Sequence, residues 1–486
     1  MLTTRLLQLA ATALALLALP GCEDSERGPL RVVAIGAPPA MVNPSSQPAG
    51  TASGLLLEAV AQGLVRFDAA GEIEPALAQS WIVSDDGRRY TFRLRRTLWA
   101  RGDPVTARQI VERLRAAISR NSRNGLRPVL GAIEQIEAMT EQVLEIRLKA
   151  PRPNFLQLLA QPELAIVANG EGTGPYRMGG EVDGALRLVP PPVDEDAEVA
   201  EEVQPEILLR ADPAPAAIAR FVNGQADLVT GGTIGDVPLL AAARLPEGQT
   251  AFDPVRGLFG LTFLRSDGLL AQAPFRQALS MSLDREGMLA RFVVPGLQPR
   301  VAILPPGLSE VPNPAVPDWA AAPLPTRREI AARIVADLAD VERPRLRVAL
   351  PPGPGYRIVF AHIRRDWRFI GVDAVAVAHG AEAELRLIDE VAPADLAPWY
   401  LRHFLCGVSA VCDQTADLFM QAARDAPLAA DRHSLLAQAE RMLGGMTAYI
   451  PIAPPVRWSL RSGRLNGFRT NVFARHALTE LIASED

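Results

Sequence analysis

The sequence predicts an α/β protein with more than one lobe. Apolar residues alternate with polar ones at Tyr90–Leu94 and again at Leu144–Leu148, which is the period of half-buried strands. Between residues 346 and 377 a strand, a helix and a strand follow one another, an order that implies a parallel pair joined by a crossover. The chain has 486 residues, too many for one hydrophobic core, so two or three lobes are expected.

The remaining elements follow from the same periodicities. Thr106 and Gln109 have the spacing of a capping box, which predicts the start of a helix with Ile110, Val111 and Leu114 on one face. Gly87 follows two aspartates and predicts a hairpin-type turn before Tyr90. The other expected elements are a strand at 30–35, a helix from about Leu55 to Gly63, a helix at 327–341, a strand at 346–350, a helix near 358–370 and a strand at 372–377.

The N-terminus has the order of a secretory signal. One positive charge, Arg5, precedes fourteen residues from Leu6 to Leu19 that are almost all Leu and Ala, a run too short to cross a bilayer comfortably. The sequence LPGC, ending at Cys22, resembles the bacterial lipobox, in which the cysteine is lipidated through its sulfur and becomes the new N-terminus. The alternative is a plain signal peptide with an incidental cysteine beside the cut. The lipobox predicts residues 1–21 as signal peptide and Cys22 as the lipid anchor.

Composition and charge exclude several classes of protein. With 48% hydrophobic and 22% charged residues the chain is that of a globular protein, and a net charge of −5 gives no sign of a nucleic-acid partner. Lys149 is the one lysine, and the many arginines are scattered along the sequence. We interpret them as a codon bias without functional content.

Motifs of catalysis and metal binding are missing from the sequence. The five histidines never lie three to five residues apart, and neither a Walker A loop nor a GxSxG elbow is present. The glycine-rich stretch 170–174 is followed by Pro175, where a phosphate-binding helix would have to begin. We therefore expect that the protein is not an enzyme and that it binds no metal and no cofactor. A catalytic triad dispersed along the chain stays an open alternative.

Cys406 and Cys412 are the two other cysteines. Five residues separate them, a loop that a disulfide can span, and an exported protein meets oxidising conditions. We predict a disulfide between them. The alternatives are a pair of buried thiols or, less in keeping with the spacing, a redox-active pair.

One long stretch resembles a known family. Residues 55–114 contain, in order, a helix ending in GLV, the phrase PALAQSW, an SDDG turn before YTFRLR, and the helix start GDPVTA. This order resembles the N-terminal signature of the family 5 extracellular solute-binding proteins, the dipeptide- and oligopeptide-binding components of ABC importers. Later landmarks recur in the family's order: GTGPY at 172–176, NGQADLV at 223–229, FRQALSMSLDRE at 275–286 and YIPI at 449–452.

The resemblance implies a fold and its division into lobes. Such proteins are two-lobed clamshells of α/β lobes, with an extra subdomain inserted in the first lobe and the ligand in the cleft between the lobes. Here the first lobe would comprise residues 28–50, 160–240 and 440–486, the inserted subdomain 51–159, and the second lobe 241–439.

The resemblance also implies ligand-binding residues in the second lobe. Peptide-binding relatives use an acidic residue near an Asp-x-x-x-Pro segment to hold the ligand's ammonium group, and Asp389 and Pro393 stand in these positions. Arg386 replaces the aromatic residue that is common shortly before, which favours a ligand with a carboxylate or another anionic group. The alternative is that Asp389 and Arg386 form a surface ion pair or are separately solvated.

Four weaker candidates complete the predicted site. Ser45, Ser46 and Gln47 lie in the loop after the first strand, where family members bring main chain and short polar groups to the ligand, but an ordinary surface turn is an equal alternative. Trp399 is a candidate for lining the pocket, although aromatic residues at such spacing more often belong to the core.

Taken with Cys22, the resemblance predicts the function. We expect a monomeric, lipid-anchored periplasmic protein that captures a peptide-like solute and delivers it to an ABC permease in the inner membrane. Whether the anchor lies in the inner or the outer membrane stays open. The alternative is a repurposed family member that acts as a sensor or assembly factor.

Overall fold

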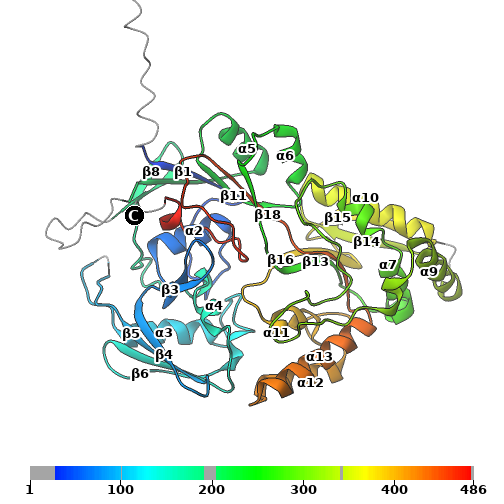
Figure 1. Cartoon of the computed structure of the whole chain (residues 1–486), viewed down its shortest axis with the longest axis horizontal. Helices are drawn as coiled ribbons and strands as arrows, with labels where there is room; N and C mark the ends of the chain where they lie inside the picture. Colours follow the sequence, from blue (N-terminus) through cyan, green and yellow to red (C-terminus); the bar gives the residue numbers. More distant parts are fainter. Residues whose placement is uncertain (1–27, 100, 191–203, 340–342, 483–486) are drawn as a thin grey trace, which may run out of the picture.

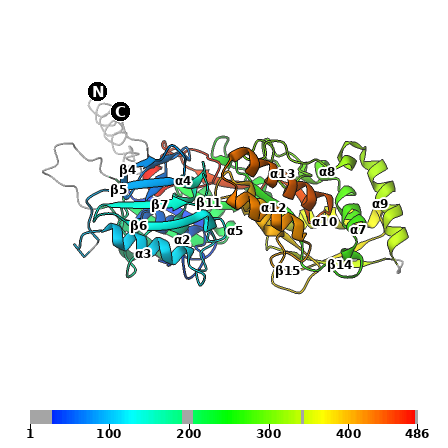
Figure 2. The same cartoon turned by 90° about the horizontal axis from the view of Figure 1, so that it is seen from below.

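The computed structural model describes residues 28–99, 101–190, 204–339 and 343–482. They form two lobes side by side, each built around its own β-sheet (Figure 1). A smaller sheet of strands β4 to β7 lies beside α2 at one end of the elongated molecule, and helices α7, α9 and α10 lie at the other end (Figure 2). Within the described ranges, no helix is long and apolar enough to cross a membrane.

The first lobe contains a seven-stranded sheet in the order β12-β18-β11-β1-β10-β9-β8. Its centre is β1 (Leu30–Ile35), as predicted, which runs parallel to β10 and β11 on either side. Its apolar residues are buried on both faces of the sheet, as expected for a central strand. The other strands are β8 (Arg177–Val182), β9 (Ala185–Val189), β10 (Ile207–Asp212), β11 (Leu228–Thr233), β12 (Thr250–Asp253) and β18 (Arg457–Arg461), with helices α5 (Ala214–Val222) and α6 (Val237–Ala243).

Helix α2 (Thr51–Val60) begins earlier and ends earlier than predicted. A helix to Gly63 is prevented because the glycine-rich loop closes against its end. Gly174 donates its backbone N–H to Val60 O over 3.0 Å, and a Cβ atom on Gly172 would lie 2.3 Å from that same oxygen. The glycines of GTGPY therefore serve a close backbone approach between segments that are far apart in sequence.

The inserted subdomain is a four-stranded antiparallel sheet in the order β4-β5-β7-β6, covered by α3 (Ala107–Ile118). The capping box is confirmed: Thr106 accepts a hydrogen bond from Gln109 N, and the Gln109 side chain accepts one from Thr106 N. Gly87 makes the predicted turn with a φ of 65°. The strands are β4 (Ala78–Val83), β5 (Arg89–Leu94), β6 (Ile133–Ala138) and β7 (Val143–Leu148); the hairpin β2 (Val65–Phe67) and β3 (Ile73–Pro75) and the short helix α4 (Phe155–Leu159) flank them.

The second lobe contains a five-stranded sheet in the order β15-β14-β16-β13-β17. The predicted crossover is confirmed, because β14 (Arg345–Leu350) and β15 (Asp373–Ala378) are parallel and α10 (Pro354–Phe369) joins them. Its other strands are β13 (Gly257–Phe263), β16 (Leu385–Val391) and β17 (Tyr449–Ala453); its helices are α7 (Ala273–Met281), α8 (Arg285–Leu289), α9 (Leu324–Leu338), α11 (Ala397–Leu401), α12 (Gln414–Asp425) and α13 (Ala429–Gly445).

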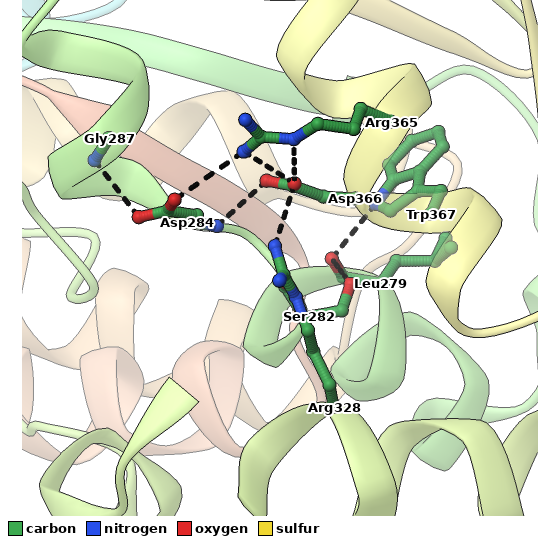
Figure 3. Close-up of polar contacts among 8 residues, drawn as sticks. All are labelled: Leu279, Ser282, Asp284, Gly287, Arg328, Arg365, Asp366 and Trp367. Atoms are coloured by element: carbon green, nitrogen blue, oxygen red, sulfur yellow. Dashed lines mark hydrogen bonds and ion pairs between the residues drawn. The ribbon is translucent and has the colours of Figure 1, made fainter. Parts of the chain in front are cut away.

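A buried carboxylate, Asp366, ties three segments of the second lobe together (Figure 3). It is fully buried on α10 and accepts hydrogen bonds from Arg328 of α9 over 2.7 Å, from the side chain of Arg365 and from the backbone N–H of Asp284. Asp284 in turn caps α8 by accepting a hydrogen bond from Gly287 N over 2.9 Å. The charge of Asp366 is thus fully paired where water cannot reach it.

Sheet membership shows where the chain passes between the lobes. Strand β12 lies in the first sheet and β17 in the second. If each lobe is defined by its sheet, the chain crosses at 254–256 and at 454–456, both later than the predicted boundaries at 240 and 440. Helix α2 packs on β1 and β10 of the first lobe and not in the inserted subdomain of 51–159. The division into lobes otherwise stays a prediction.

We predict that Asp366→Ala lowers the free energy of unfolding by about 3 kcal/mol, because Arg328 loses its partner in a buried setting. Urea denaturation followed by tryptophan fluorescence measures this change. Arg368→Ala is the matched control: its partner Asp373 is 34% exposed, so the loss should stay below about 1 kcal/mol. Equal losses in the two variants would contradict the assigned role of Asp366.

Candidate functional site

The two lobes are joined by a pair of adjacent crossings. Asp253 pairs with Arg457 where β12 meets β18 in the first sheet, and Phe259 pairs with Ala453 where β13 meets β17 in the second. The connections 254–256 and 454–456 therefore run antiparallel to each other between the sheets. Two short, neighbouring connections are the geometry of a hinge.

Asp389 lies at this hinge, at the end of β16. Its Oδ1 accepts a hydrogen bond from Arg457 Nη1 over 2.7 Å, and its Oδ2 accepts one from the Tyr356 hydroxyl over 2.7 Å. Arg457 also donates to the backbone oxygen of Asp389 over 3.0 Å. The Asp389 side chain is 4% exposed, and Arg457 comes from the other sheet. The predicted ligand carboxylate thus forms a buried ion pair between the two lobes.

The groups of this cluster stabilise one another's protonation states. Burial alone would lower the pKa of Arg457, but the charge and hydrogen bond of Asp389 outweigh it and raise that pKa above its ordinary value. Burial, and then the neighbouring Asp389, raise the pKa of Tyr356, so its hydroxyl keeps its proton and donates. The backbone N–H of Gly355 adds a further bond to Gly235 O of the first lobe over 2.8 Å.

Arg386 is not brought to Asp389. The two residues are three apart on β16, whose register with β13 is unbroken, so their side chains point to opposite faces of the sheet. The Nε atom of Arg386 is buried without a hydrogen-bond partner. The alternative of a surface ion pair between these two residues is wrong, because Asp389 pairs with Arg457.

The loop candidates lie elsewhere. The backbone oxygen of Ser45 accepts hydrogen bonds from Arg123 and Ser122 of the inserted subdomain, while Ser46 and Gln47 are exposed turn residues. Trp399 is 4% exposed and packs edge-on against Tyr400 and His403. None of the contacts described for these four candidates joins them to Asp389. Their ligand-binding roles stay predictions.

A second set of contacts between the lobes involves the loop that follows β16. This loop starts beside the hinge, because Ala392 donates its backbone N–H to Arg256 O of the first crossing over 2.8 Å. Gln161 donates to Pro393 O over 2.6 Å, Asn154 donates to Asp395 O over 2.5 Å, and Gln157 accepts from Asp395 N over 3.1 Å. We call these three bonds the clasp; they join the segment around α4 to the loop 392–396. Sequence reasoning named Pro393 only as a family landmark, and no signal singled out the amide side chains in and beside α4.

Beside the clasp lies a cavity of about 290 Å³ between the inserted subdomain and the second lobe. Phe155 and Leu158 line it from one side, and Leu396, Leu405 and Met420 line it from the other. Its polar lining consists of five arginines: Arg127, Arg152, Arg402, Arg424 and Arg432. These residues are scattered over 300 positions of sequence, so sequence reasoning missed the cluster that the fold assembles.

The predictions for the three cysteines have different outcomes. The predicted bond between Cys406 and Cys412 is confirmed by a disulfide in the loop before α12. Cys22 and the predicted signal peptide lie outside the described residues. Within the described ranges, no group of three or more His, Cys, Asp or Glu side chains is arranged to hold a metal ion.

Known proteins resemble this chain over most of its length. The profile of the bacterial extracellular solute-binding proteins, family 5 (middle), matches residues 72–338. The nickel-binding periplasmic protein of Escherichia coli is 35% identical over 104 residues, which cover 21% of this chain and 20% of that protein. The dipeptide-binding protein of Pseudomonas aeruginosa is 22% identical over 503 residues, covering 90% and 92%. The match thus spans about a fifth of the first relative and nine-tenths of the second.

Among solved structures, the Haemophilus influenzae OppA complex with the peptide RPPGFSPFR superposes with a TM-score of 0.80. The identity is 18%, and the match covers 93% of this chain and 99% of the other. The likeness confirms the predicted two-lobed fold of periplasmic binding proteins.

We predict a strong coupling between Asp389 and Arg457, because either residue alone would leave a charge buried without its partner. Each single substitution to Ala should lower the free energy of unfolding by about 3 to 5 kcal/mol, and the double variant should lose much less than the sum. A double-mutant cycle by urea denaturation measures the coupling. Arg265 and Asp267, an ion pair with side chains 44% and 66% exposed, are the control and should couple by less than about 1 kcal/mol. Additive losses at 389 and 457 would refute the interlobe ion pair.

Proposed function

Because the chain belongs to the bacterial extracellular solute-binding proteins of family 5, we propose that it captures a solute between its lobes and delivers it to the permease of an ABC importer. The observation that carries the proposal is the arrangement of the two lobes. They are joined by two adjacent crossings and are also bonded to each other at the clasp, with the arginine-lined cavity beside it. Opening at the hinge would break the three bonds of the clasp and expose the cavity.

The solute is peptide-like in this proposal, because several relatives are dipeptide- or oligopeptide-binding proteins. One feature separates this chain from a simple peptide binder. The Oδ1 atom of Asp389, where a ligand ammonium group would bind, is already paired with Arg457. A ligand would have to displace a buried guanidinium to reach it, at the cost of an unpaired charge. This favours a solute that contacts the protein through groups other than a free ammonium group.

Export and anchoring complete the proposal. Cys22 carries a lipid that holds the protein on the membrane in the periplasm, close to its permease. Stable anchoring takes more than one acyl chain, which a lipidated N-terminal cysteine supplies.

We predict that a ligand makes the molecule more compact. Small-angle scattering should show a smaller radius of gyration with a bound ligand, which at one hundred times its dissociation constant also adds about 2.7 kcal/mol of stability. The variant Asn154→Ala/Gln161→Ala loses two of the three bonds of the clasp. In this variant the same ligand should produce a smaller decrease in the radius of gyration. An unchanged radius and unfolding midpoint across di-, tri- and oligopeptides and opines would argue against solute capture.

For the anchor, we predict that cells expressing the protein incorporate radiolabelled palmitate into it and that Cys22→Ala abolishes the label. Cys406→Ala is the control, since its sulfur is already in a disulfide, and it should leave the labelling intact. Unlabelled wild-type protein, released freely to the periplasm, would refute lipid anchoring.

A further inference from the structure

We propose that the cavity between the inserted subdomain and the second lobe binds the anionic group of the solute, and that the solute is an organic anion with an apolar body. The inference rests on the proposed function and names the class of ligand for it. The cavity of about 290 Å³ is just smaller than the range for small-molecule sites, which is roughly 300 to 1,000 Å³.

The cavity carries an excess of positive charge. Among the residues that the structure describes, Arg432 is the one arginine of the five that forms an ion pair, with the buried Glu310. Arg152 donates to two backbone oxygens, those of Pro151 and Arg424, which accept two of its hydrogens without neutralising its charge. Burial, and then the charge of Arg432, lower the pKa of Arg152 to about 10, while Glu310 and Asp425 oppose this. An anion in the cavity would relieve this repulsion.

Three of the arginines have donors to spare. In the described part of the chain, the side chains of Arg127, Arg402 and Arg424 form neither a hydrogen bond nor an ion pair with the protein. The Nε atom of Arg402 is buried and unsatisfied, although its guanidinium lies 5.9 Å from the ring of Trp399. A buried donor without a partner is costly, and a carboxylate is the group that matches a guanidinium with two parallel bonds.

The rest of the lining selects the body of the ligand. Phe155 and Leu158 from the inserted subdomain face the same space as Leu396, Leu405 and Met420 from the second lobe. Bare inorganic phosphate would leave this apolar surface uncovered, whereas an aromatic or aliphatic acid would cover it. Because both sides of the cleft supply lining residues, such a ligand would bridge them and favour the closed arrangement.

The test is a fluorescence titration of the full mature protein with dansyl-glycine, which combines an aromatic body with a carboxylate. Dansylamide, which has the same fluorophore without the carboxylate, is the matched neutral probe. We expect dansyl-glycine to bind at least tenfold more tightly than dansylamide, and more weakly as salt rises. Arg402→Met should weaken the binding of dansyl-glycine about tenfold, and the double variant Arg127→Met/Arg402→Met should weaken it more. Neither variant should change the affinity for dansylamide. Arg364→Met, an exposed arginine on the outer face of α10, is the control and should change neither affinity.

Equal affinities for the two probes, or dansyl-glycine binding that Arg402→Met leaves unchanged, would overturn the proposal. Displacement of dansyl-glycine by inorganic phosphate at equal affinity would overturn its apolar part. This site and the proposed function can fail independently. If peptides compact the protein while dansyl-glycine does not bind, the anion site is refuted and solute capture is supported. A natural acidic peptide and a fatty acid share the required chemistry, and competition by each against dansyl-glycine distinguishes them.

Discussion

The ion pair between Asp389 and Arg457 is the contact on which the arrangement of the lobes depends. It joins the end of β16 in one sheet to the first residue of β18 in the other, beside both crossings of the chain. A buried charge needs its partner more than an exposed one does, so the pair resists separation of the strands it connects. Tyr356 and Gly355 extend the cluster to the start of α10. The cluster thereby fixes how the two sheets meet beside the crossings of the chain.

This use of Asp389 changes the chemistry that remains for a ligand. The carboxylate suited to an ammonium group is already paired within the protein. In the described part of the chain, four of the five arginines that line the cavity form no ion pair. Charge in the cleft is therefore biased toward binding anions. The cavity also depends on two parts of the chain, because Arg152 lines it from the inserted subdomain and Arg402 lines it from the second lobe.

Much of the fold could be predicted because its signals are local. Each of these signals depends on residues that are close in sequence. The structure confirms the alternation at Tyr90–Leu94, the capping box at Thr106, and the strand, helix and strand between 345 and 378. Helix α2 was misplaced because its end is set by Gly172 and Gly174, more than a hundred residues away. The disulfide was predictable because its two cysteines are close in sequence and leave few other pairings.

The sequence by itself determined the α/β class, the family resemblance and the short-range devices that start and stop its elements. Tertiary structure alone decided the pairing of Asp389 with Arg457, the separation of Arg386 from both, and the gathering of arginines that look scattered along the chain. The physical reason is that a side chain's partners in space are set by which strands and helices pack together. Charge–charge energies depend on that distance and on burial, neither of which is written in the order of residues.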